Sequence, residues 1–106
     1  MIVVCNRIRV KSGMAEKMAP MFTRSGPLQQ FQGFHKVEVL VASLEDHDEL
    51  NVNMYWDDLA SFQVWRDSDA FKQAHRRPEG SDNSDSPVLG STLLTLNVAA
   101  SMSAAN

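Results

Sequence analysis

The feature that most constrains the fold is the order in which strand-like and helix-like hydrophobic patterns follow one another along the 106 residues. The first pattern is a strict alternation, in which Ile2, Val4, Asn6, Ile8 and Val10 share one face of a strand over residues 2–10. The patterns that follow predict a helix over 14–24, strands over 34–42 and 50–56, a helical region from Asp57 or Asp58 to His75, and a strand over 92–98. Because Ser68 and Asp69 are good N-caps, we expect two short helices to meet there.

The order strand, helix, strand, strand, helix, strand predicts an α+β fold. With right-handed crossovers it gives a ferredoxin-like βαββαβ plait, in which helices cover one face of a four-stranded antiparallel sheet. A chain of this length forms one domain, expected over residues 1–98, with a flexible tail over 99–106. The polar loop over 76–87 is long for so small a domain, which indicates a functional or mobile segment.

The second face of the predicted sheet has no helix to cover it. It still carries apolar side chains, among them Val3 and Cys5. A small domain has little core and gains much by burying such a face against another molecule. We therefore expect a homodimer.

Composition excludes several classes of function. Ten basic against thirteen acidic residues give a net charge of −3, which removes the bulk electrostatic case for binding nucleic acid. The one cysteine, Cys5, excludes a cysteine-rich metal cluster, and no apolar run suits a signal peptide or a membrane span. No phosphate-binding loop, zinc spacing or nucleophile motif is present. We expect a cytoplasmic protein with no nucleic-acid or membrane partner.

Asn6 is the first residue that could carry chemistry. It stands on a strand face otherwise composed of Ile2, Val4, Ile8 and Val10. An amide without a partner would cost about 1–3 kcal/mol there. Two interpretations remain open: a core amide bonded to backbone or buried water, or a donor directed into a cavity.

His75 and Trp65 lie on one helical stretch. A histidine at the end of a helix often only caps it, but beside Arg76 and Arg77 it could also ligate haem iron while the arginines pair with the propionates. Trp65, ten positions earlier, could line the same cleft or belong to the core. His35 and His47 are expected at the surface, and the acidic stretch over 44–49 that contains His47 is expected to form a solvated loop.

Five stretches of the sequence resemble the IsdG-like haem-degrading monooxygenases, within the antibiotic-biosynthesis-monooxygenase superfamily of dimeric barrels. They are Asn6-Arg7, Phe22 to Gly26, Gly33-Phe34, the stretch from Trp65 to Arg76, and Ser86-Pro87-Val88. The resemblance extends from about Ile2 to Val98. An asparagine, a tryptophan and a histidine in these three places are fairly specific, whereas the loop over 76–86 and the last eight residues do not match with confidence.

The resemblance implies an enzyme with haem oxygenase activity, in which haem is both substrate and cofactor. O₂ and electrons from an external donor, a reductase or a small reductant, would open the porphyrin ring and release iron. The implied catalytic residues are Asn6, Trp65 and His75. His75 would be the proximal ligand of the haem iron, Asn6 would hydrogen-bond iron-bound O₂ on the distal side, and Trp65 would distort the ring. The residues expected to bind the cofactor are Met21, Phe22, Thr23, Arg24, Ser25 and Gly26.

The resemblance also implies a homodimeric β-barrel with one haem in each subunit, between the helices and the sheet. Two alternatives remain. One is a cofactor-free monooxygenase of an aromatic or polyketide substrate on the same dimeric barrel, and the other is a haem-binding protein without turnover.

Overall fold

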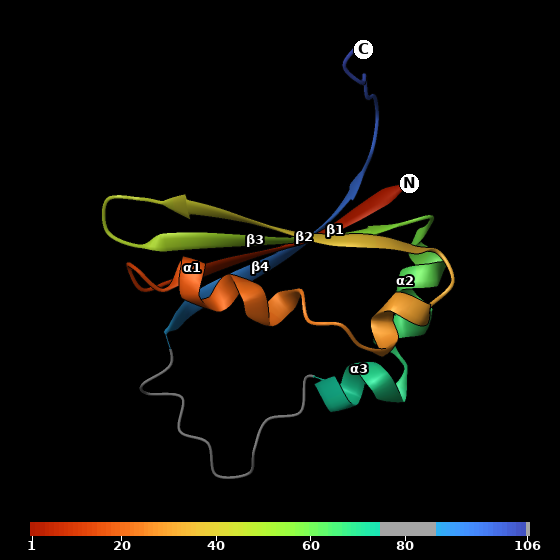
Figure 1. Ribbon diagram of the computed structural model, residues 1–106, viewed down its shortest axis with the longest axis horizontal. Helices are drawn as coiled ribbons and strands as arrows, with labels where there is room; N and C mark the ends of the chain where they lie inside the picture. Colours follow the sequence, from red (N-terminus) through yellow and green to blue (C-terminus); the bar gives the residue numbers. More distant parts are fainter. Residues whose placement is uncertain (75–86, 106) are drawn as a thin grey trace.

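The computed structural model describes residues 1–74 and 87–105 and confirms the predicted α+β plait. Four strands form one sheet in the order β2-β3-β1-β4, and every ladder is antiparallel. The helices lie on one side of this sheet (Figure 1). The elements are β1 Ile2–Val10, α1 Ala15–Met18, η1 Ala19–Phe22, η2 Pro27–Gln30, β2 Phe34–Ser43, β3 Asp48–Trp56, α2 Leu59–Arg66, α3 Asp69–Ala74 and β4 Val88–Asn97.

The predicted first helix is shorter and broken. The α-helix ends at Met18, a 3₁₀ turn continues to Phe22, and the residues to Arg24 are not helical. Pro20 explains the change, because its nitrogen has no hydrogen for the bond that an α-helix would need at this position. A further 3₁₀ turn, η2, begins at Pro27 and was not predicted.

Asp48 corrects the prediction of a solvated acidic loop over 44–49. Strand β3 begins at Asp48, two residues earlier than expected, and this carboxylate is buried. Its Oδ2 accepts hydrogen bonds from the backbone N–H of Gly13 at 2.9 Å and of Ala15 at 3.3 Å. A carboxylate from a distant strand thus anchors the start of α1, where no local side chain provides a cap.

Strand β4 also begins earlier than predicted, at Val88 rather than Thr92. It pairs with β1 along its length, and the guanidinium of Arg9 crosses over Gly90. A Cβ at Gly90 would lie 2.5 Å from Nη2 of Arg9, the end of a flexible side chain that can move aside. The extra length of β4 comes from its pairing with the end of β1, which local patterning does not reveal.

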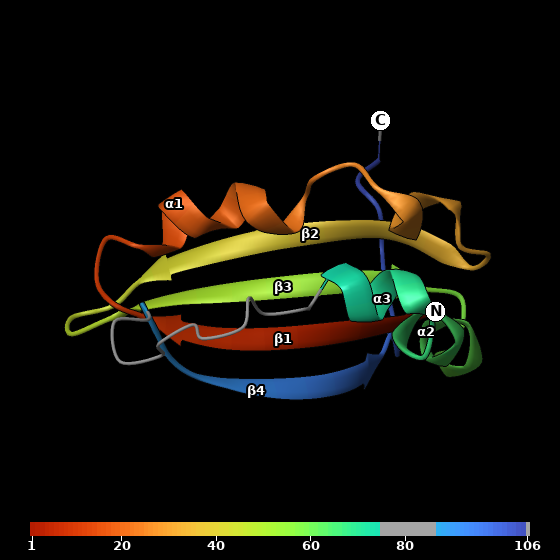
Figure 2. The same ribbon diagram turned by 90° about the horizontal axis from the view of Figure 1, so that it is seen from below.

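The prediction of two short helices meeting near Ser68 is confirmed. Asp58 caps α2 by accepting the N–H of Ser61 at 2.8 Å, and this bond lowers the pKa of the Asp58 carboxyl. Ser68 caps α3 by accepting the N–H of Phe71 at 3.2 Å, and it donates its hydroxyl to the carbonyl of Trp65 at 2.6 Å. This turn directs α3 back under the sheet (Figure 2).

The helix-covered face of the sheet, called the inner face below, carries two apolar clusters. The first cluster contains Ile2, Val4, Trp56, Phe62 and Trp65 under α2 and α3. The second contains Ile8, Val10, Ala15, Leu50 and Val52 under α1 and η1. Each cluster fills one end of the inner face, and the middle of β1 lies between them.

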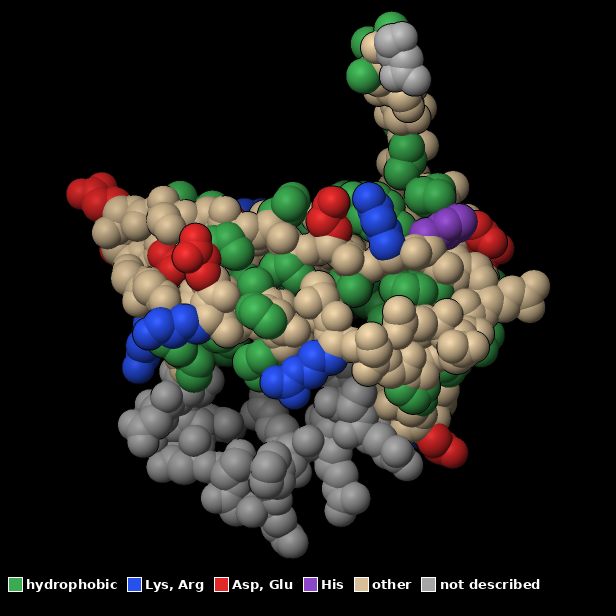
Figure 3. All heavy atoms as spheres, viewed as in Figure 1, with side chains coloured by type: hydrophobic (Ala, Val, Ile, Leu, Met, Phe, Trp, Pro, Cys, Tyr) green, Lys and Arg blue, Asp and Glu red, His purple; other side chains and the backbone are tan. Residues whose placement is uncertain are grey.

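The opposite face, called the outer face below, is not covered by any described element. Arg7 and Glu49 form an ion pair there at 2.9 Å, and Tyr55 donates to Glu38 at 3.2 Å. Burial, with the Glu38 carboxylate beside it, raises the pKa of the Tyr55 phenol. Figure 3 shows acidic and basic side chains interspersed on the side of the molecule in view, without one dominant charge.

Residues 98–105 have no regular secondary structure and rise from the sheet on the side away from the helices (Figure 1). The limits of the domain and the flexibility of the tail stay predictions. Across residues 1–74 and 87–105, no helix has the length and apolar character needed to cross a membrane.

Candidate functional site

Asn6 lies in the middle of β1 on the inner face, between the two apolar clusters. Val4, on one side of it, belongs to the first cluster, and Ile8, on the other, belongs to the second. Asn6 is half-buried, and none of the residues that the structure describes hydrogen-bonds its side-chain amide. Between two apolar clusters thus lies a polar group whose donors and acceptor are free for a ligand or for residues outside the described part.

Trp65 lies on α2 and is part of the first cluster, with 7% of its surface exposed. Its ring meets Phe71 of α3 edge-on at a centroid distance of 4.7 Å, and it lies 6.1 Å from the ring of Trp56. Val4 belongs to the same cluster, and side chains two residues apart on a strand are about 6.6–7 Å apart. The structure therefore brings Trp65 and Asn6 to the same side of the sheet, with Val4 beside Asn6.

His75 lies outside the described residues, so its side chain has no described position. The helix that leads to it is described: α3 runs from the α2 end of the molecule toward the middle of β1 (Figure 2). Phe71, one turn before His75, packs against the first cluster. The role of His75 stays a prediction, and α3 ends on the side of the sheet that carries Asn6 (Figure 1).

The residues expected to bind the cofactor, 21–26, form the end of η1 and the connection from η1 to η2. Phe22 is half-buried against the second cluster, whereas Met21 is 56% exposed. Two hydrogen bonds between residues three apart shape this segment. Thr23 Oγ1 donates to the carbonyl of Pro20 at 3.4 Å, and Gln29 Oε1 accepts the N–H of Gly26 at 3.2 Å. Arg24 and Ser25 are exposed, and the binding role of this segment stays a prediction.

The two other histidines and the cysteine either pair with a carboxylate or face away from Asn6. His35 is paired with Asp57 at 2.5 Å, and His47 with Asp46 at 2.6 Å. Cys5 faces the outer side, and burial raises the pKa of its thiol, which disfavours the thiolate that ligation requires. Within the described residues, no three side chains of the histidine, cysteine or acidic types group as a metal site.

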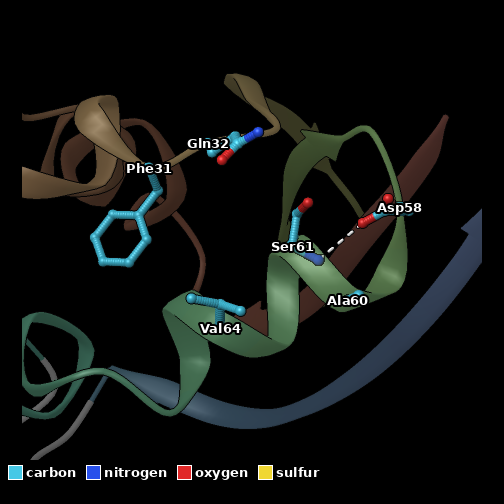
Figure 4. A pocket seen from close by; sticks show the side chains of 6 residues that line it. All are labelled: Phe31, Gln32, Asp58, Ala60, Ser61 and Val64. Carbon is cyan, nitrogen blue, oxygen red and sulfur yellow. Dashed lines mark hydrogen bonds between the residues drawn. The ribbon is translucent and has the colours of Figure 1, made fainter.

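A hollow of about 320 Å³ lies beside α2 and is lined by Phe31, Gln32, Asp58, Ala60, Ser61 and Val64 (Figure 4). Neither Asn6 nor Trp65 borders it. Its one carboxylate, Asp58, is bonded to the N–H of Ser61 as the cap of α2. The carboxylate of the hollow is therefore engaged in capping a helix.

Trp56 is a residue of this region that sequence reasoning did not single out. It is fully buried between Phe34, Phe62 and Trp65, and its Nε1–H has no acceptor among the described residues. The alternation over Leu50, Val52, Met54 and Trp56 was the available signal, since it placed this second tryptophan on the inner face. Trp65 therefore does not stand alone but packs against a second indole.

Comparison with known proteins identifies the family. The model of the antibiotic biosynthesis monooxygenase family matches residues 1–77. A Staphylococcus saprophyticus protein named heme oxygenase (staphylobilin-producing) is 46% identical over 97% of this chain and 100% of its own length.

Two solved structures share the fold. A candidate antibiotic biosynthesis monooxygenase from Bacillus cereus superposes with a TM-score of 0.80 at 24% identity, over 100% of this chain and 98% of its own. The heme degrader MhuD from Mycobacterium tuberculosis, solved with two hemes bound in its active site, superposes with a TM-score of 0.72 at 19% identity, over 97% of this chain and 100% of its own. The resemblance identified in the sequence is thereby confirmed, and the chain belongs to the antibiotic biosynthesis monooxygenase family.

Proposed function

We propose that this protein is a haem-degrading monooxygenase, which opens the porphyrin ring with O₂ and releases the iron. The observation that carries the proposal is the amide of Asn6, which lies between the two apolar clusters of the inner face and has no hydrogen-bond partner among the described residues. The relative named heme oxygenase, 46% identical over nearly the whole chain, supports the same activity.

The inner face fits haem in its chemistry. Haem is a flat, largely apolar ring, and sites for such ligands are mostly apolar with a few placed polar groups. Here two apolar clusters flank an amide without a partner among the described residues, and the half-buried ring of Phe71 packs at the border of the first cluster. Arg24, Arg76 or Arg77 could pair with the propionates.

Haem supplies both the ring that is oxidised and the iron at which O₂ is reduced. In the proposal, His75 would hold the haem iron. Asn6 would donate a hydrogen bond that orients O₂ at the ring. Trp65 would press on the ring and favour a distorted conformation. These roles give a single reason for an amide in an apolar strand and a histidine after a short helix.

The reaction consumes electrons, and amino-acid side chains do not supply electrons over repeated turnovers. We therefore propose an external donor, either a reductase or a small reductant. A supply of reducing equivalents is typical of the cytoplasm, which is the location we propose.

We also propose that the outer faces of two copies pack together in a homodimer. Leu40, Leu94 and Leu96 are 48%, 39% and 45% exposed on this face in the isolated chain. Oδ1 of Asn51, also on this face, is buried without a partner among the described residues. A donor from a second copy would satisfy it and remove a penalty of about 1–3 kcal/mol.

Sedimentation velocity tests the dimer. A dimer at micromolar concentration is expected, burying well above about 1,000 Å² in total. A monomer under these conditions would contradict the barrel.

Titration of the apo protein with ferric haem, followed by reductant under air, tests the function. A Soret band that saturates near one haem per subunit and then decays with release of iron is expected. A stable Soret band after reduction would indicate a haem carrier instead. No Soret band would leave a cofactor-free monooxygenase of the same family.

A further inference from the structure

Leu93 occupies a position on β4 that neither cluster accounts for. The register places it directly across from Asn6, so both side chains lie on the inner face. A row of four residues crosses the sheet at this level: Val39 on β2, Val52 on β3, Asn6 on β1 and Leu93 on β4. Val39 and Val52 pack under α1 and η1, whereas Leu93 is 59% exposed.

The neighbours of Leu93 on β4 make it distinct. The other β4 residues between 91 and 97 that share its face are Ser91, Thr95 and Asn97, which are all polar. The described helices pack mainly against β2 and β3, so no described helix covers this edge of the inner face. A lone exposed leucine is common on protein surfaces, but this one lies across from Asn6, whose amide has no partner among the described residues.

We infer that Leu93 is the part of the haem site that supports the porphyrin on the Asn6 side. The inference rests on the proposed function and adds to it a contact residue outside the asparagine, tryptophan and histidine set. Leu93 and Asn6 together provide what a flat apolar ligand with one reactive centre requires: an apolar support with a single hydrogen-bond donor at its border. Haem seated there buries the leucine, so that side chain contributes to binding rather than to chemistry.

Leu94 offers a matched control. It follows Leu93 in sequence, has the same side chain, and points to the outer face, where it is 39% exposed. Thr92 and Thr95 show that threonine is tolerated in this strand, and threonine retains a high strand propensity. L93T and L94T therefore remove the same apolar group from opposite faces of one strand.

The experiment measures three quantities on apo wild type, L93T, L94T and L93M. These are the Kd for ferric haem from the Soret titration, the Tm, and the sedimentation coefficient. L93T should raise the haem Kd about tenfold, as expected for partial loss of one buried leucine contact, with Tm and dimerisation unchanged. L93M should keep the wild-type Kd because the apolar contact is retained, and L94T should keep it because its change is on the other face.

Three results would overturn the inference. If wild type binds haem and L93T binds it equally well, Leu93 is not part of the site, while the proposed function stands. If L93T lowers the apo Tm without changing Kd, Leu93 packs within the protein. If wild type itself binds no haem, the proposed function and the inference both fail.

Discussion

Replacement of Asn6 separates a functional amide from a structural one. Among the described residues its side chain forms no hydrogen bond, so Asn6→Ala removes no observed interaction from the apo protein. The expected change in the free energy of unfolding is below about 1 kcal/mol, which is a Tm shift of no more than about 4–8 °C. Loss of one hydrogen-bond donor at a reacting centre lowers turnover about 10²–10³-fold.

The assay measures the rate of Soret decay per bound haem, at saturating reductant under air, beside the Tm of the apo protein. Asn6→Leu is the companion variant, because it restores the apolar pattern of Ile2, Val4, Ile8 and Val10. It should match or exceed the wild-type Tm and should turn over as slowly as Asn6→Ala. A fall in Tm in both variants, with the wild-type rate per bound haem, would show that the Asn6 amide stabilises the core and has no role in turnover.

Three further predictions concern single side chains. Asp48→Ala leaves one buried and one part-buried N–H group without their acceptor, so it should lower stability by about 3 kcal/mol and Tm by about 12–24 °C in a thermal melt. Asp46→Ala, at an exposed carboxylate, should leave the thermal melt unchanged. Trp65→Phe should keep the fold and part of the rate of haem turnover. Trp65→Ala should lose about 3–5 kcal/mol of stability and more of that rate. Equal rates per bound haem in the two variants would exclude a role for the size of the Trp65 side chain. His75→Ala should shift the ferric Soret band and abolish ring opening, with the Tm of the apo protein unchanged. The control His35→Ala should behave like wild type. An unshifted Soret band with normal turnover in His75→Ala would show that another residue binds the iron.

Local patterning predicted the elements whose signals lie within a few residues. Alternation gave β1 to the residue, because one side of that strand is buried along its whole length except at Asn6. The caps Asp58 and Ser68 marked both short helices, because each accepts an N–H three residues ahead.

The elements that sequence missed depend on contacts between distant residues. Asp48 was read as part of a solvated loop, because its partners Gly13 and Ala15 are far from it in sequence. The start of β4 was missed because its first residues pair with Arg9 and Val10 of β1, and this pairing exists only in the assembled sheet.

The candidate site followed the same division. Asn6 was visible as a polar residue in an apolar alternation, and Trp65 as an aromatic residue on a helix, so both could be singled out from the sequence. Leu93 looked like any strand leucine, and only the register across from Asn6 distinguishes it from Leu94. Predicting such a residue requires knowing which strand lies next to β1.

The proposed activity is tested most directly by the fate of haem bound to the wild-type protein. The measurement is a spectrum of the ferric haem complex during aerobic turnover with reductant, with iron release followed by a ferrous chelator. Haem degradation predicts loss of the Soret band, one iron released per bound haem, and a product chromophore with an opened ring. A Soret band that persists through reduction, with no chelatable iron, would contradict it.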